Sequence, residues 1–440
     1  MADRYRLDEK QFRLVILNFI HIAVCCISLI FVAGLYPDYH IGYYSRRLLG
    51  AVVVILAFAG VSPLFAFARV SFGYLVGFYF YTMILGYLWL NVFSDFSYNH
   101  ALTGLSAAVS GVAFLLPALF ISSPVRQIYV LSSSAFDRLL TCILLLAIAT
   151  IAVGAMYNFR FVSIENIYAF REKLAFPTIL SYLIEITSNA LLPLAFACFV
   201  ARRDFWRAGV VLVLLSLFYP INLSKLALFT PVWLVAMALV SKIFDFKITV
   251  TLSVLVPVSV GIVLAVLFRN GTISSNAAMP YFGLINFRMI AIPSLAMDYY
   301  NYFFSAHDLT YFCQMRLLKG FVSCPYQQQL AVVIYNAFGI GGNFNASLFA
   351  TEGIASVGPL FAPFTAFACG LIIAIGNRCS AGLPSRFILI SGAVLPQAFL
   401  NVPLTTILLT HGCAALFLLW YITPRMMFQH EGVSATAAIA

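Results

Sequence analysis

The chain has 440 residues, of which 63% are hydrophobic and only 9% are charged. Charged residues make up about a quarter of an ordinary soluble protein, so this composition excludes a soluble globular protein and indicates a chain that crosses a membrane many times. The formal net charge of +10 does not indicate nucleic-acid binding, because Lys and Arg of membrane proteins collect at the cytoplasmic face and near anionic headgroups.

The apolar segments are predicted to be helices, because a span needs about 20 apolar residues and unpaired backbone groups in lipid are costly. We expect about twelve transmembrane helices, at residues 14–35, 48–67, 70–92, 102–121, 139–157, 178–200, 208–222, 226–241, 249–268, 354–376, 387–402 and 404–422. The pattern therefore predicts an all-α, polytopic membrane helix bundle in which residues 1–440 form a single domain.

The distribution of basic residues predicts which loops lie outside. With the N-terminus in the cytoplasm, most of the 25 Lys and Arg fall in short inner loops, as the positive-inside rule requires. Both termini are then cytoplasmic, and two outer loops remain, at residues 158–177 and 269–353. We expect short interfacial helices in the larger loop, because residues 281–304 are apolar but interrupted by charges and a proline.

Two basic residues lie where an outer loop meets the helices. Arg171 comes just before the span at 178–200, where it can bind an anion or can simply lie among headgroups beside Glu165 and Glu172. Lys225 lies in a break between two short helical segments. A broken membrane helix exposes backbone groups that protein or water must satisfy, so this lysine either faces a site or extends to the interface.

Glu185 is the acidic residue placed well inside a predicted span, and an intramembrane carboxylate is a functional candidate because its charge is costly there. Asn189 follows one turn later on the same face. His411 falls at a similar depth in the last span and is a candidate partner. The alternative is that Glu185 is protonated and bonded to neighbouring hydroxyls, and that His411 is structural.

Cysteine positions predict one disulfide. Cys313 and Cys324 lie in the large outer loop, whereas the other seven of the nine cysteines lie in predicted spans or at the inner face. An oxidising outer compartment would allow this pair to close a small loop. The sequence contains no cluster with metal-ligand spacing, so no metal and no cofactor are expected.

Several segments together resemble the bacterial oligosaccharide repeat-unit polymerases, the O-antigen polymerase family, which are similar in architecture to O-antigen ligases. The resemblance covers about residues 158–377 and rests on Ile167–Arg171 before a span, Leu223–Lys225 between short helices, and a long late outer loop containing Asn336–Gly339 and Ala350–Gly358. Lys225 departs from the pattern, because an arginine is common at this position.

The resemblance implies a metal-independent glycosyltransferase of the bacterial inner membrane that polymerises undecaprenyl-diphosphate-linked oligosaccharides into surface polysaccharide on the periplasmic face. Membrane lipids would surround it, and a chain-length regulator is a candidate partner. The charge that develops on the diphosphate must be met by cations, and the candidates are Arg171, Lys225, Arg288, Arg269 and Arg316. The acceptor hydroxyl needs a base, and the candidates are His307, Asp308, Asp298 and Glu352.

Other functions remain open from the sequence. An O-antigen ligase would use the same chemistry with a different acceptor. A lipid-linked glycan flippase or secondary transporter would use Glu185 and His411 at a midplane site, although few polar residues lie along the cytoplasmic half. A membrane O-acyltransferase would need a catalytic histidine toward the cytoplasm, where His21 has no evident partners.

Overall fold

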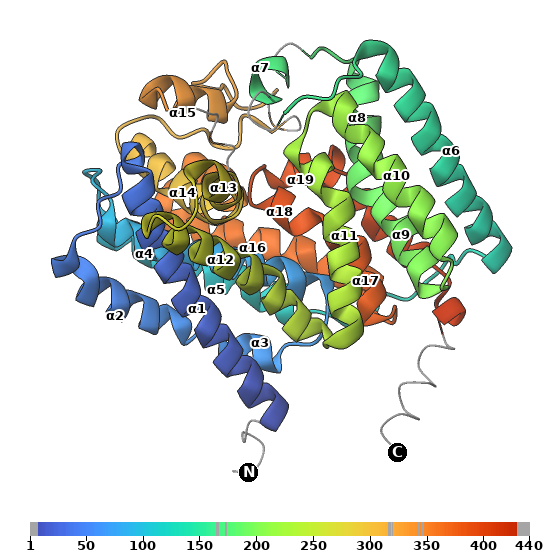
Figure 1. The fold of residues 1–440 in the computed structure, drawn as a ribbon, viewed down its shortest axis with the longest axis horizontal. Helices are drawn as coiled ribbons and strands as arrows, with labels where there is room; N and C mark the ends of the chain where they lie inside the picture. The colour runs from blue at the N-terminus through green and yellow to red at the C-terminus, as the bar shows by residue number, and fades with distance from the viewer. Residues whose placement is uncertain are drawn as a thin grey trace. The chain divides into compact units, whose positions relative to one another are not determined.

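The computed structural model describes residues 8–163, 167–171, 174–315, 318, 320–340, 344 and 347–428. Regular secondary structure in these residues is helical, and the extended backbone contributes only an isolated bridge between Ile41 and Ser94. The chain divides into two compact units (Figure 1). The first unit comprises Met1–Ile121, Lys247–Ala374 and Gln397–Leu404, and the second comprises Ser122–Phe246, Ile375–Pro396 and Thr405–Ala440.

Helices of the first unit come from both halves of the chain. They are α1 (Glu9–Leu35), η2 (Pro37–Tyr39), η3 (Ser45–Arg47), α2 (Leu48–Ala59), α3 (Pro63–Phe67), α4 (Phe72–Phe93), α5 (His100–Phe120), α12 (Phe246–Arg269), α13 (Ser275–Phe282), η5 (Gly283–Ala291), α14 (Ile292–Phe304), α15 (Leu330–Phe338) and η6 (Phe349–Ile354). Helix α16 (Ala355–Ser380) begins in this unit and ends in the second.

Helices of the second unit are mostly consecutive in the chain. They are α6 (Ser133–Tyr157), α7 (Ile167–Arg171), α8 (Thr178–Ile186), η4 (Thr187–Leu191), α9 (Leu192–Ala201), α10 (Phe205–Asn222), α11 (Lys225–Ile243), α17 (Ser385–Gly392), α19 (Leu404–Leu409), α20 (Cys413–Ile422) and η7 (Arg425–Phe428). Helix α18 (Leu395–Phe399) lies at the boundary between the two units in the chain.

Ten helices in the described part of the chain are long and apolar enough to cross a membrane. Each coincides with one of the first ten predicted spans, from α1 to the helix that includes η6 and α16. The protein is therefore a multi-pass membrane protein built from helices, as the composition predicts.

The last two predicted spans are not continuous helices, which corrects the sequence interpretation of residues 387–402 and 404–422. This stretch forms the short helices α17, α18, α19 and α20. A turn at residues 393 and 394 separates α17 from α18, and Gly412, which has a left-handed backbone conformation with φ 77°, separates α19 from α20. Hydropathy alone does not detect these two interruptions.

In the first unit, α4 is the central helix. Nearly all of its residues are buried, and it packs against α1, α2, α5 and α14. A helix that is apolar on all sides is expected to be enclosed by others. Gly86 brings α4 close to α14, because a Cβ there would lie 2.4 Å from Oγ of Ser294. That hydroxyl donates to the carbonyl of Met83 over 3.0 Å.

In the second unit, α10 packs against α6, α9 and α11, and α17 packs against α9 and α11. Ser391 on α17 accepts a hydrogen bond of 3.0 Å from the indole N–H of the fully buried Trp420 on α20. These contacts form the framework that holds the polar side chains described next.

Candidate functional site

In the second unit one membrane helix widens into a π turn directly after a carboxylate. Helix α8 carries Glu185 in its last turn and continues through the π turn η4 into α9. Pro193 accounts for the widening, because it has no N–H for the carbonyl of Asn189 and its ring would collide with that carbonyl in a regular α-helix. π turns inside α-helices frequently occur at functional sites.

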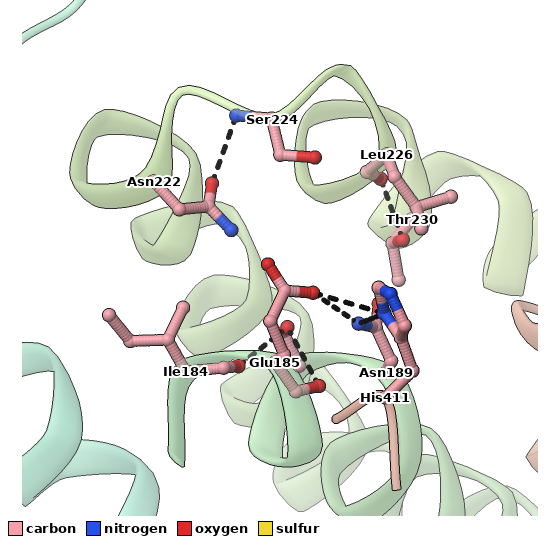
Figure 2. A network of polar contacts seen from close by, with 9 residues as sticks. Ile184, Glu185, Asn189, Asn222, Ser224, Leu226, Thr230 and His411 are labelled. Carbon is pink, nitrogen blue, oxygen red and sulfur yellow. Dashed lines mark hydrogen bonds and ion pairs between the residues drawn. The ribbon is translucent and has the colours of Figure 1, made fainter. Parts of the chain in front are cut away.

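Glu185 forms a cluster with Asn189 and His411, called the Glu185 cluster below (Figure 2). Nδ2 of Asn189 donates to Oε2 of Glu185 over 2.7 Å, and Nδ1 of His411 lies 3.2 Å from the same oxygen. Asn189 is buried, whereas 26% of the Glu185 side chain and 14% of the His411 side chain are exposed. The fold therefore holds the cluster in place while leaving two of its side chains accessible.

Gly412 allows His411 to approach the π turn. A Cβ at residue 412 would lie 3.0 Å from Cβ of Ala190 and 3.1 Å from Cγ2 of Ile186. The positive φ of Gly412 also belongs to a region that side chains disfavour. Residue 412 therefore needs both a small side chain and a positive φ, and glycine provides both.

The break between α10 and α11 is drawn directly above the Glu185 cluster in Figure 2. Leu223 has a φ of 47°, an uncommon left-handed conformation for a branched residue. Oδ1 of Asn222 accepts a hydrogen bond of 3.0 Å from the backbone N–H of Ser224. Nδ2 of Asn158 donates to two carbonyls in the last turn of α10, each over 2.9 Å. Side-chain amides thus satisfy backbone groups that the helix break exposes, as a low-dielectric environment requires.

The short helix α7 packs onto this break. Ile167, its first residue, is fully buried in a cluster with Leu223 and the largely buried Tyr219. Arg171, its last residue, is exposed and close enough to Glu185 for a favourable charge interaction. Lys225 is half-buried at the start of α11. The segments Ile167–Arg171 and Leu223–Lys225, which are distant in sequence, therefore lie together near the Glu185 cluster.

Two tautomers of His411 are compatible with this geometry. If Nδ1 carries the proton, it donates to Oε2 of Glu185 and leaves Nε2 as a proton acceptor. If Nδ1 is unprotonated, it accepts from Nδ2 of Asn189, which lies 3.0 Å away. Nε2 of His411 has no hydrogen-bond partner among the described residues. A carboxylate at Nδ1 is the arrangement that prepares an imidazole to accept a proton at Nε2.

Asp298, a predicted base, lies in the first unit inside a set of hydrogen bonds that extends to Asn91 and His100. It is fully buried. One of its oxygens accepts from Oγ of Ser94 over 2.8 Å and the other accepts from the hydroxyl of Tyr98. The same set continues to Tyr87 and Asn301, and these five residues are called the Asp298 network. Both carboxylate oxygens are already occupied, so the network connects α14 to α4 and to the loop after it.

The other three predicted bases also belong to the first unit, and two of them have local partners there. Glu352 is buried in η6, where Oε2 accepts from the backbone N–H of Leu404 over 3.1 Å. His307 stacks on Phe303 with ring centroids 3.9 Å apart, and its Nδ1 lies 2.8 Å from the Phe303 carbonyl. Asp308 is exposed. The His307 and Asp308 side chains are not hydrogen-bonded to one another.

The predicted cations divide between the two units. Arg171 and Lys225 belong to the second unit. Arg269, exposed at the end of α12, and Arg288, half-buried in η5, belong to the first unit. Arg316 lies outside the described residues. Cys313 and Cys324 are joined by a disulfide in the first unit.

Sequence reasoning did not detect the contributions of Asn158 and Gly412. Asn158 marks the end of a predicted span, but nothing in the sequence indicates that its side chain bonds to carbonyls of a helix more than 60 residues later. Pro193 was an available signal for the π turn, because it follows a polar residue at a spacing of four. The pairing of Glu185 with Asn189 and His411 was a sequence hypothesis, and the structure places all three within hydrogen-bonding distance.

Comparison with known proteins gives no match: no family model, no curated protein and no solved structure corresponds to this chain.

Proposed function

We propose that the chain is a membrane glycosyltransferase that moves an oligosaccharide from a lipid diphosphate to a hydroxyl of an incoming lipid-linked repeat unit, and so builds a polysaccharide. The observation that carries the proposal is the packing of Ile167–Arg171 on Leu223–Lys225 beside the Glu185 cluster. These are two of the sequence elements on which the resemblance to repeat-unit polymerases rests. This packing brings two cations, Arg171 and Lys225, near a proton acceptor, His411, in the second unit.

The proposed reaction breaks the bond between the anomeric carbon and the diphosphate oxygen, and that oxygen keeps the electron pair. Arg171 and Lys225 stabilise the negative charge of the departing lipid diphosphate. A hydrogen bond to a charged group contributes about 1.5 to 3 kcal/mol, so two such contacts have a large effect on rate. Apolar surroundings strengthen these interactions, because the effective dielectric constant is low.

The acceptor hydroxyl supplies the nucleophile. Its oxygen bonds to the anomeric carbon, and its proton moves to Nε2 of His411. Glu185 accepts from Nδ1–H, which fixes the ring and stabilises the imidazolium that forms. Asn189 donates to Glu185 and keeps the carboxylate in position. This division of roles uses His411 as the base in place of the four bases predicted from the sequence.

A lipid-linked glycan carrier is the second candidate, and one observation favours it. Glu185 lies about 10 Å along the helix from the start of α8, by the 1.5 Å rise per residue, so the carboxylate lies within a membrane helix. The imidazole beside it comes from the break between α19 and α20. Intramembrane pairs of this kind can relay protons in transporters.

A reconstitution experiment separates the two candidates. Purified full-length protein in liposomes is given a radiolabelled oligosaccharide on undecaprenyl diphosphate, and glycan length and released lipid diphosphate are measured together. The proposal predicts longer glycans with one lipid diphosphate released for each bond formed, and loss of both in His411→Gln. Movement of intact substrate across the bilayer without diphosphate release would support the carrier. Transfer to a lipid A core acceptor, with no polymer formed, would support a ligase.

A further inference from the structure

The second unit has a cavity where α6 begins and where α9 passes into α10. Its volume is about 520 Å³, and its lining includes Arg138, Arg202 and Arg207 together with Leu140, Leu144 and Phe199. This volume lies within the range of about 300 to 1,000 Å³ that is usual for ligand pockets. Arg202 follows Glu185 by 17 residues, which corresponds to about 25 Å along a helix. The cavity is therefore distinct from the Glu185 cluster.

The arginines exceed the nearby carboxylates in number. Arg202 pairs with Asp137 at 2.5 Å, and Arg207 pairs with Asp204 at 3.4 Å. Arg138 is exposed and makes no ion pair within the described part of the chain. Three guanidinium groups thus face two carboxylates, and the remaining positive charge favours an anion.

The rest of the lining is apolar, which indicates what kind of anion fits. Leu140, Leu144 and Phe199 line the cavity beside the arginines. Phe205 and Trp206 start α10 next to Arg207, and their exposed fractions are 69% and 81%. Exposed aromatic side chains at a helix end are typical of the boundary between headgroups and hydrocarbon. A ligand that meets both surfaces must be amphiphilic.

We propose that this cavity binds an anionic membrane phospholipid, with the headgroup phosphate at Arg138, Arg202 and Arg207 and an acyl chain along Leu140, Leu144 and Phe199. Basic pockets between membrane helices are known to hold such headgroups. Guanidinium groups bind phosphate through paired N–H donors. A soluble phosphate would leave the apolar part of the cavity unused.

Native mass spectrometry of the full-length protein in detergent tests this assignment with phosphatidylglycerol, phosphatidylcholine and inorganic phosphate as probes. We expect phosphatidylglycerol to be retained at least tenfold more than phosphatidylcholine. Arg138→Gln should reduce that retention about tenfold, the effect of losing one charge-assisted contact. Arg69→Gln is the matched control, because Arg69 is exposed and does not line the cavity. Equal retention of the two lipids, or displacement of phosphatidylglycerol by equimolar inorganic phosphate, would overturn the proposal.

Cys142 supplies an independent readout, because it lines the cavity and is exposed, whereas the other six free cysteines are buried or half-buried. Phosphatidylglycerol should slow maleimide labelling of Cys142 at least fivefold, and phosphatidylcholine should not. The wild-type protein suffices for this measurement if Arg138→Gln does not fold. Labelling that is equally fast with both lipids would contradict the proposal.

Discussion

The Glu185 cluster and the Asp298 network each contain an acid beside a π turn, but different side chains surround the two carboxylates. Glu185 precedes its π turn and Asp298 follows its own. Each acid lies on a helix interrupted by a π turn, and a proline follows the turn, at Pro193 in one case and Pro293 in the other. Asp298 is fully buried and receives hydrogen bonds from hydroxyls. Glu185 is partly exposed beside an imidazole.

The difference teaches that the hydrogen-bond partners of an acid, and not its depth alone, decide whether it is a candidate for chemistry. Burial raises the pKa of Asp298 to about 7, and the hydrogen bonds from Tyr98 and Ser94 oppose that rise. The carboxyl group of Asp298 bonds to hydroxyl groups and not directly to an imidazole, and these bonds join helices. In the Glu185 cluster, the imidazole can take up a proton and Arg171 adds a positive charge nearby.

The largest effect is expected at His411. His411→Gln removes the nitrogen that accepts the proton and should lower glycan transfer by about 10² to 10⁴-fold, the usual contribution of a positioned base. This fall in glycan transfer is measured as the initial rate of lipid diphosphate release. His307→Gln is the matched control and should leave the rate within twofold, because that ring stacks on Phe303. The opposite ranking would move the base to the segment after α14, where His307 lies.

Glu185→Gln comes next. The amide cannot stabilise an imidazolium, so the rate should fall by about 10²-fold, at the lower end of the range for acid–base catalysis. Glu352→Gln is the control, since its amide oxygen can still accept from the Leu404 N–H. If both variants lose activity equally, the distinction between the two carboxylates is wrong.

Arg171→Gln and Lys225→Gln should each reduce the rate by about 10 to 100-fold, which corresponds to about 1.5 to 3 kcal/mol for one charged hydrogen bond. Arg160→Gln removes the same charge between α6 and α7, where the Arg160 side chain is exposed, and should have little effect. Full activity of Arg171→Gln would show that the cation at the end of α7 does not bind the diphosphate.

The helical membrane fold follows from the sequence more completely than the site does. Ten of the twelve predicted spans coincide with long apolar helices, because long apolar runs have few ways to satisfy their backbone. The contact between Ile167 and Leu223 depends on how α7 packs, and hydropathy contains no information about it. Glu185, Asn189 and His411 could be predicted as a group because a charge in lipid needs a partner. The hydrogen bonds from Ser94 and Tyr98 that enclose Asp298 could not be predicted from the sequence, because these residues are about 200 positions apart in the chain.

A smaller effect on stability is expected at Gly412. Gly412→Ala adds a Cβ against Ala190 and Ile186 at a positive φ, which should cost about 1 to 3 kcal/mol. Thermal unfolding in detergent measures the loss. Gly209→Ala in α10 meets no atom within 4 Å and should be neutral or slightly stabilising. Equal melting temperatures for the two variants would show that the approach of α20 to η4 is not tight.

A further effect is expected on the pH dependence of stability. Because the folded pKa of Asp298 lies above its unfolded value, the fold favours the protonated carboxyl group. That contribution is complete below about pH 4 and is lost as the pH rises through about 7. Asp298→Asn should therefore flatten the decline in melting temperature between pH 5 and 8, whereas Asp308→Asn at an exposed position should not. If the melting temperature of Asp298→Asn declined with pH as steeply as that of the wild-type protein, the raised pKa of Asp298 would be contradicted.

Photo-crosslinking tests the location of the site most directly. A lipid diphosphate with a photoreactive group next to the phosphates is bound to the full-length protein, irradiated, and mapped by peptide mass spectrometry. The account predicts crosslinks at residues 167–171 and 222–230, which excess unlabelled lipid diphosphate abolishes. Crosslinks confined to residues 294–308, beside Asp298 and His307, would place the chemistry in the first unit and contradict the account.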